Sequence, residues 1–106
     1  MEMRLTHPNK VKGNNFEREI VNLAKSIGLD AKRAYASDGR SLGESEKVDL
    51  MIGKTRVQAK RRKKLAEYMK IPEGADIVVM REDRGELLAV VQFEKILQLI
   101  KEGLWE

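Results

Sequence analysis

Apolar and polar residues alternate in two adjacent segments near the middle of the chain. Residues 48–52 are Val-Asp-Leu-Met-Ile, and residues 55–60 are Thr-Arg-Val-Gln-Ala-Lys. A period of two predicts β-strands, each with one face directed at the core. Gly53-Lys54 lies between the two segments with glycine first, which predicts a two-residue type II′ turn. The pattern therefore predicts a β-hairpin.

The predicted hairpin gathers polar side chains on one face. The turn makes Ile52 face Thr55. Further from the turn Asp49 faces Gln58, with Cβ atoms roughly 5 Å apart, and Lys60 follows on the same face. A carboxylate, an amide oxygen and an ammonium group can together hold a divalent metal and activate water against a phosphate. The opposite face is apolar and is expected to enter the core: Val48, Leu50, Val57 and Ala59.

An amphipathic helix is predicted before the hairpin. Asn14 or Asn15 is its expected N-cap, it runs to about Ile27, and Gly28 is its expected C′ residue. At about 100° per residue, Glu17 falls inside an apolar arc, where a carboxylate is costly unless it is paired or bound to a metal. Either Glu17 lies near the edge of the arc and reaches solvent or an arginine, or it points toward the hairpin. The arc comprises Phe16, Ile20, Val21, Leu23, Ala24 and Ile27.

The whole pattern predicts an α/β fold: a mixed β-sheet flanked by helices, in the order α-β-β-β-α-β-β-α. Residues 1–13 are expected to form a flexible basic arm. Tyr35 is interpreted as a partly buried tyrosine of the sheet, with stacking on a nucleic-acid base as the alternative. Besides the first helix and the hairpin, the expected elements are a short strand at 31–36, a mobile loop at 37–46, a short helix at 65–70, strands at 76–81 and 86–93, and a helix at 94–102 that stops at Gly103.

Length and composition narrow the class of protein. The 106 residues are expected to form one domain. No apolar run approaches the roughly 20 residues of a membrane span, and no membrane partner is expected. With no cysteine, the chain has no disulfide and no thiolate zinc site. The N-terminal residues lack an apolar signal segment, so we expect a cytoplasmic location.

The charge leans toward a polyanionic partner. The net charge is +4, and five consecutive cations form the run Lys60-Arg-Arg-Lys-Lys64. Such a run by itself is equally consistent with a solvated turn. Because it directly follows the predicted site, we interpret it as a phosphate-binding segment.

Four segments carry a family resemblance. They are Lys12-Gly-Asn-Asn-Phe-Glu-Arg-Glu-Ile20, Arg33, Val48-Asp-Leu50 and Val57-Gln-Ala-Lys60. In this order and spacing, over roughly residues 12–60, the chain resembles the archaeal Holliday junction resolvases, small members of the PD-(D/E)xK nuclease superfamily. The resemblance implies the restriction-endonuclease-like fold, a Mg²⁺- or Mn²⁺-dependent endonuclease activity and a role in DNA recombination.

The resemblance also implies roles for single residues. Glu17, Asp49, Gln58 and Lys60 form the implied catalytic set, and the first three are the implied metal ligands. The backbone carbonyl of Ala59 is a further expected ligand. Arg18 and Arg33 match basic positions that assist in DNA binding or catalysis, and Ser37 matches a serine in the loop before the aspartate. The expected DNA contacts are Lys12, Arg18, Arg33, Ser37, Arg40, Arg61, Arg62, Lys63 and Lys64.

Two departures from the family pattern affect the interpretation. Gln58 stands where the family has glutamate; its amide oxygen can ligate a hard cation, but it adds no charge and cannot act as a general base. The loop at 38–47 is longer than in the compact archaeal enzymes, and Glu44 or Glu46 either supplements the metal site or is a solvated loop charge. This form looks more like phage-borne relatives, which suggests a viral gene.

The sequence thus predicts a structure-selective DNA endonuclease, most specifically a Holliday junction resolvase acting on four-way junctions. Because such an enzyme cuts two opposed strands, a symmetric homodimer is expected. One alternative is a nuclease for flaps, nicks or linear duplex. Gln58 favours another alternative, a non-catalytic DNA-binding protein that retains the fold. A basic structural protein of a ribonucleoprotein is a third.

Overall fold

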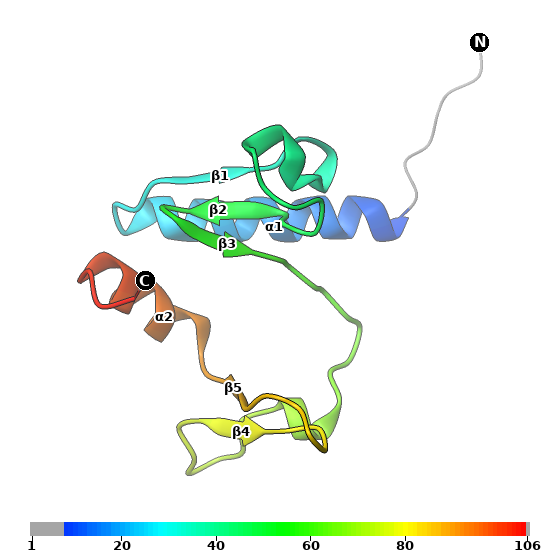
Figure 1. Cartoon of the computed structure of the whole chain (residues 1–106), viewed down its shortest axis with the longest axis vertical. Coiled ribbons are helices and arrows are strands. Elements are labelled where there is room, and N and C mark those ends of the chain that lie inside the picture. The colour runs from blue at the N-terminus through cyan, green and yellow to red at the C-terminus, as the bar shows by residue number, and fades with distance from the viewer. Residues whose placement is uncertain (1–7, 106) are drawn as a thin grey trace. The chain divides into compact units, whose positions relative to one another are not determined.

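A long helix and a three-stranded antiparallel sheet form the first half of the protein (Figure 1). The computed structural model describes residues 8–105. It divides them into two units, residues 8–61 and residues 62–105. The expectation of a single nuclease domain stays a prediction, and each unit is described by itself.

Helix α1 spans Pro8–Ser26 and begins well before the predicted start at residue 14 or 15. Proline suits the first position of a helix, because its missing N–H would have no partner there. The prediction of an N-cap at Asn14 or Asn15 is therefore wrong. The predicted flexible arm is helical from residue 8 to residue 13, and its first seven residues lie outside the described part of the chain.

The end of α1 follows the prediction. Gly28 has φ 89°, a left-handed conformation that glycine adopts without the clash of a Cβ. Its N–H donates to the carbonyl of Lys25 at 3.0 Å, and the N–H of Leu29 donates to the carbonyl of Ala24 at 3.0 Å. These two bonds make a Schellman motif, which satisfies carbonyls that the helix end leaves open.

Strands β1 (Ala31–Arg33), β2 (Leu50–Ile52) and β3 (Thr55–Val57) form the sheet in the order β1-β2-β3. The predicted hairpin is confirmed: Ile52 pairs with Thr55. The turn has φ 57° at Gly53, as a type II′ turn requires at its first position. Strands β2 and β3 are shorter than predicted at the ends away from the turn.

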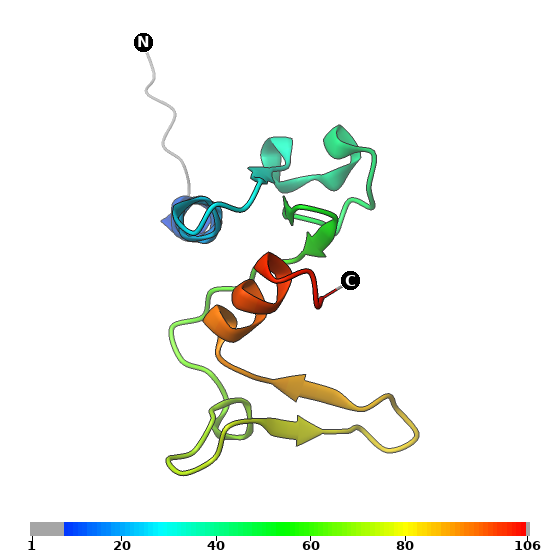
Figure 2. The same cartoon turned by 90° about the vertical axis from the view of Figure 1, so that its left-hand side faces the viewer.

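The core of this unit lies between α1 and the sheet. Helix α1 packs against β1 and β2, and Figure 2 shows the helix end-on beside the strands. Leu50 and Ile52 are fully buried, as the alternation predicts for one face of a strand. The buried residues of the unit are Glu17, Ile20, Val21 and Ala24 on α1, and Ala31, Ala34, Val48, Leu50 and Ile52 around the sheet, with Gly39 in the connection.

Two short 3-10 helices, Tyr35–Ser37 and Gly39–Leu42, fill most of the segment between β1 and β2. The predicted loop at 37–46 therefore contains 3-10 helical structure, and its expected mobility stays a prediction. The carboxylate of Asp38 accepts the N–H of Arg40 and starts the second helix. Gly39 is buried so closely against the carbonyl of Ser45 and the side chain of Val48 that a Cβ would collide with both.

The second unit contains a two-stranded antiparallel sheet and a helix. Strands β4 (Val78–Met80) and β5 (Leu88–Val90) pair with each other, and Val78 lies opposite Val90. Helix α2 (Phe93–Lys101) matches the prediction closely. Gly103 follows the helix end with φ 74°. The two hydrogen bonds there have the same Schellman pattern as those at the end of α1. The predicted helix at 65–70 is a single 3-10 turn, Glu67–Met69.

The fold is thus a mixed α/β fold with two α-helices and five strands in the described residues. The predicted order differs at its middle helix, because a 3-10 turn stands there. The prediction of one mixed sheet is wrong for the described residues, because the five strands form two separate sheets that are antiparallel throughout. The physical reason is that β3 ends at Val57 and an exposed, cation-rich segment follows it. Between residues 8 and 105, no helix is both long enough and apolar enough to cross a membrane.

Candidate functional site

Glu17 faces the core of the first unit and forms an ion pair there. Its side chain is 7% exposed, and its Oε1 lies 3.4 Å from Nε of Arg33, whose side chain is 24% exposed. Arg33 also donates from Nη2 to the amide oxygen of Asn14 at 3.3 Å. Asn14 precedes Glu17 by one helical turn, so both lie on the same side of α1.

This geometry combines the two interpretations of Glu17. The carboxylate points inward, as its place in the apolar arc predicts. It also has an arginine partner, as the alternative interpretation predicts. Arg33 lies opposite Leu50 in the sheet, on the face that α1 covers. The charge of the guanidinium thus offsets the cost of burying the carboxylate.

Asp49 interrupts the pairing of β2 with β3. Leu50 is the register partner of Val57, yet the N–H of Asp49 also donates to the carbonyl of Val57 at 2.8 Å. Its own carbonyl accepts the N–H of Ala34 at 2.8 Å, on the β1 side. Asp49 and Leu50, the first residue of β2, therefore both face Val57 of β3, which is the arrangement of a β-bulge. A bulge changes the direction of its side chains, and such bulges are common beside functional sites.

The carboxylate of Asp49 completes this local structure. Its Oδ2 accepts the N–H of Ala59 at 2.7 Å. Asp49 is thus bonded to Val57 and to Ala59, the residues on both sides of Gln58. We call this pair of hydrogen bonds the Asp49 clamp. It fixes the backbone at Gln58 and explains why the regular strands end here, at Leu50 and Val57, instead of continuing to the predicted bounds.

The clamp joins Asp49 to the segment that contains two other predicted site residues, Gln58 and Lys60. Asp49 is half-buried, whereas Gln58 and Lys60 are exposed. The other oxygen of Asp49, Oδ1, has no hydrogen bond to any residue in the described range. The site therefore offers a fixed carboxylate with an open oxygen, next to an exposed amide and an exposed ammonium group.

These donors fit a hard divalent cation by their chemistry. Carboxylate, amide and carbonyl oxygens are the ligands that Mg²⁺ and Mn²⁺ take in proteins, and Asp49, Gln58 and Ala59 supply one of each. Between residues 8 and 105 no three Asp, Glu, His or Cys side chains gather into a metal-holding group. Glu17 is bonded to Arg33.

The predicted DNA contacts are spread over both units. Lys12 and Arg18 are exposed on α1, and Arg18 donates to Asn15 at 3.4 Å. Ser37 is the last residue of the first 3-10 helix. The basic run is exposed along its whole length, Lys60, Arg61, Arg62, Lys63 and Lys64. Its first two residues belong to the first unit and its last three to the second.

Arg40 has a protein partner close by. Its Nε lies 2.9 Å from Oδ2 of Asp38. The hydrogen bond from this guanidinium lowers the pKa of the Asp38 carboxyl, and the carboxylate in turn raises the pKa of Arg40. Glu44 lies in the same connection and pairs with Arg56 of β3 at 3.7 Å. Both pairs tie the connection between β1 and β2 to itself or to the sheet.

Tyr35 does not lie in the sheet. Strand β1 ends at Arg33 instead of Ala36, and the Tyr35 side chain is 83% exposed. The interpretation of Tyr35 as a partly buried sheet residue is therefore wrong.

Several contacts of the site are missing from the sequence prediction. Asn14 could have been found, because it lies three positions before Glu17 on the same helix face. The N–H of Ala59 gives no sequence signal, since its bond to Asp49 arises only where the ladder breaks. The same holds for Ser41, whose Oγ accepts the N–H of Tyr35 at 2.8 Å.

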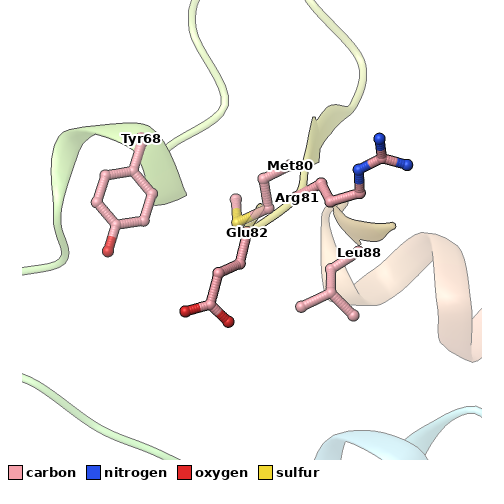
Figure 3. A pocket seen from close by; sticks show the side chains of 5 residues that line it. All are labelled: Tyr68, Met80, Arg81, Glu82 and Leu88. Atoms are coloured by element: carbon pink, nitrogen blue, oxygen red, sulfur yellow. The ribbon is translucent and has the colours of Figure 1, made fainter. Parts of the chain in front are cut away.

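The second unit has a pocket of its own, with a volume of about 540 Å³. Tyr68, Met80, Arg81, Glu82 and Leu88 line it, and Figure 3 shows the tyrosine ring on the 3-10 turn opposite side chains from β4 and β5. None of the predicted site residues lines this pocket.

Comparison with known proteins gives no match: the chain matches no protein-family model, no curated protein and no solved structure.

Proposed function

We propose that this protein is a metal-dependent DNA endonuclease that hydrolyses phosphodiester bonds at branched DNA, as a Holliday junction resolvase does. The observation that carries the proposal is the Asp49 clamp, which fixes a half-buried carboxylate against the backbone on both sides of Gln58. Lys60 lies two residues after Gln58. Hydrolysis of a phosphodiester needs a positioned carboxylate and a nearby cation in this way, because charge builds on the phosphate as water attacks.

Each residue then has a defined task. Asp49, Gln58 and the carbonyl of Ala59 would hold Mg²⁺ or Mn²⁺, and the ion would supply an acidified water and polarise the phosphate. Lys60 stabilises the negative charge that develops on the phosphate oxygens. Glu17, which is paired with Arg33, would add a carboxylate from α1 to the metal ligands, and Arg33 would contact DNA.

The basic run gives the proposal its substrate class. Five adjacent exposed cations after β3 suit a backbone of phosphates, which they position without reading base sequence. Structure-selective cleavage agrees with this. A homodimer, expected for cutting two opposed strands, belongs to the same proposal.

The finer fold assignment also belongs to the proposal. The order of α1, β1, β2 and β3 supports a restriction-endonuclease-like domain, because the helix carboxylate and the hairpin carboxylate then come from two elements of one layered unit. A cytoplasmic location and a viral source remain expectations of the same kind.

A second candidate is a DNA-binding protein of this fold without catalysis. Two observations favour it: residue 58 is glutamine, and the Glu17 carboxylate is occupied by Arg33. Both reduce the negative charge available to a metal, and a site with fewer charged ligands binds Mg²⁺ more weakly.

Charge variants at the clamp separate the two candidates. Asp49→Asn keeps an oxygen for the N–H of Ala59 but loses the charge, so the local fold is retained while metal binding fails. We expect this variant to bind a four-way junction like the parent and to lose cleavage by roughly 100-fold or more. Gln58→Glu is expected to improve cleavage in Mg²⁺ relative to Mn²⁺.

The matched control is Asp83→Asn, an exposed carboxylate of the second unit, which should cut like the parent. If the parent protein binds the junction but never cuts it in either metal, and Gln58→Glu does not cut either, the non-catalytic candidate is correct.

A further inference from the structure

Tyr35 is exceptional in the first unit because of its exposure. The unit buries apolar side chains of α1 and the sheet. Among residues 12–61, Tyr35 is the one large apolar side chain that is exposed. At 83% exposure, its ring has neither a packing role nor a place in the core. Apart from the backbone of Tyr35, no atom of this residue has a hydrogen bond to the described residues.

The backbone that carries Tyr35 is nevertheless firmly held. Its N–H donates to Oγ of Ser41 at 2.8 Å, and its carbonyl accepts the N–H of Asp38 at 2.9 Å. The hydroxyl of Ser41 in turn donates to the carbonyl of Asp38 at 3.1 Å. The ring therefore stands on a closed hydrogen-bonded turn rather than on a mobile loop.

The turn is also strained at the next residue. Ala36 has φ 51°, a left-handed conformation that is unfavourable for a residue with a Cβ. Non-glycine residues stay in this region when the surrounding structure holds them there, often at ligand-binding positions. Here the left-handed residue lies directly after Tyr35, within the first 3-10 helix.

The chemistry of the neighbours points to a nucleic acid. Arg33, two positions before Tyr35, bonds to Glu17 of the proposed metal site. An exposed aromatic ring two positions from a cation suits a nucleotide, since every base has a face that stacks on an aromatic ring. Paired bases inside a duplex are already stacked on both faces, so only an unpaired or terminal base is available to Tyr35.

From these observations we propose that Tyr35 is a stacking platform for an unpaired base at the branch point of the bound DNA. The inference rests on the proposed function and deepens it, because it makes Tyr35 the residue that distinguishes branched DNA from continuous duplex. The basic run then supplies affinity for both DNA forms, and Tyr35 supplies the difference between them.

Binding measurements with an inactive protein test this platform. In the Asp49→Asn background, Tyr35→Ala and Tyr35→Phe are compared by fluorescence anisotropy on a junction with an unpaired base at its branch and on a continuous duplex of equal length. We expect Tyr35→Ala to weaken junction binding by about fivefold or more, with unchanged duplex binding. Tyr35→Phe keeps the ring and should bind like the parent.

A fluorescent base analogue at the branch gives a second signal. Its emission should be quenched by the parent and by Tyr35→Phe, and not by Tyr35→Ala, because quenching requires the ring against the base. Tyr68→Ala, which removes the exposed tyrosine of the second unit, is the matched control and should change neither signal. Ser41→Ala loosens the turn and should give a smaller loss.

The outcomes also separate this inference from the proposed function. Equal junction binding by Tyr35→Ala and the parent overturns the platform, while cleavage by the unmodified protein leaves the nuclease in place. Tyr35-dependent binding with no cleavage by the unmodified protein in any metal leaves the platform and overturns the nuclease. Absence of DNA binding overturns both.

Discussion

The two units of this protein treat their apolar side chains in opposite ways. In the first unit, eight apolar residues are buried, and Tyr35 is the one large apolar residue with high exposure among residues 12–61. In the second unit, Leu97 alone is buried, and eleven large apolar side chains are exposed among residues 62–105. Rigid packing fixes side chains within narrow limits, so the first unit can hold a site such as the Asp49 clamp in one geometry.

The second unit presents an apolar surface, as interaction sites do. Ile77, Val79, Leu87 and Leu88 are all exposed around the β4–β5 hairpin, which Figure 2 shows as two long arms. The homodimer expected from the sequence stays a prediction. The difference teaches that the first unit fixes its side chains in a packed core, whereas the second unit leaves most of its large apolar side chains exposed.

The largest expected effect tests this contrast directly. Leu50 is fully buried and Leu88 is 60% exposed, although both are leucines in strands. Leu50→Ala should lower the free energy of unfolding by about 2–5 kcal/mol, because it removes packed methyl groups and leaves a cavity. Leu88→Ala should change it by less than about 0.5 kcal/mol for the monomer. Urea unfolding at two protein concentrations measures both.

A loss for Leu88→Ala at low concentration that equals the loss for Leu50→Ala would contradict the contrast. A loss that appears only at high concentration would sharpen it, since dimer stability depends on concentration.

The next effect concerns the buried ion pair. Arg33→Met leaves the Glu17 carboxylate, 7% exposed, without its guanidinium partner, whereas Glu17→Gln leaves an arginine that is 24% exposed and can reach water. Arg33→Met should therefore be the more destabilising change, approaching the about 3–5 kcal/mol typical of a broken buried pair. Thermal unfolding of both variants and of Arg56→Met, which breaks the exposed pair with Glu44, gives the order. The opposite order would show that Glu17 is not the buried partner.

Local patterns carried much of this fold into the sequence prediction. The 3.6-residue period of α1, the Gly53-Lys54 turn and Gly28 each act over a few residues, so helix, hairpin and helix end were predictable. Glu17 stood out because a charge on an apolar arc has few explanations.

The rest depended on contacts between distant residues. The bulge at Asp49 arises because a side-chain oxygen takes the N–H of Ala59 from the strand ladder, and no periodicity records such an exchange. Tyr35 leaves the sheet because Ser41 and Asp38 bind its backbone. A three-residue strand has too few positions for its period to show where it stops.

The smallest effect lies at the exposed turn of the first unit. Asp38 and Arg40 form a hydrogen-bonded pair that lowers the pKa of Asp38 below its ordinary value of 3.8. A carboxyl with a lowered pKa stabilises the folded turn above that ordinary value, and the stabilisation is lost as the pH falls through the lowered value. Arg40→Gln should return the pKa of Asp38 toward 3.8, as NMR titration of the carboxyl would measure. An unchanged pKa would mean that Arg40 is not its partner in solution.

Cleavage of a four-way junction with and without Mg²⁺ or Mn²⁺ tests the central claim most directly. The account predicts symmetric cuts in two opposed strands by the unmodified protein, only when a metal is present, and a loss of roughly 100-fold or more in Asp49→Asn with binding retained. Cleavage that persists in Asp49→Asn, or no cleavage of any branched DNA in either metal, would contradict it.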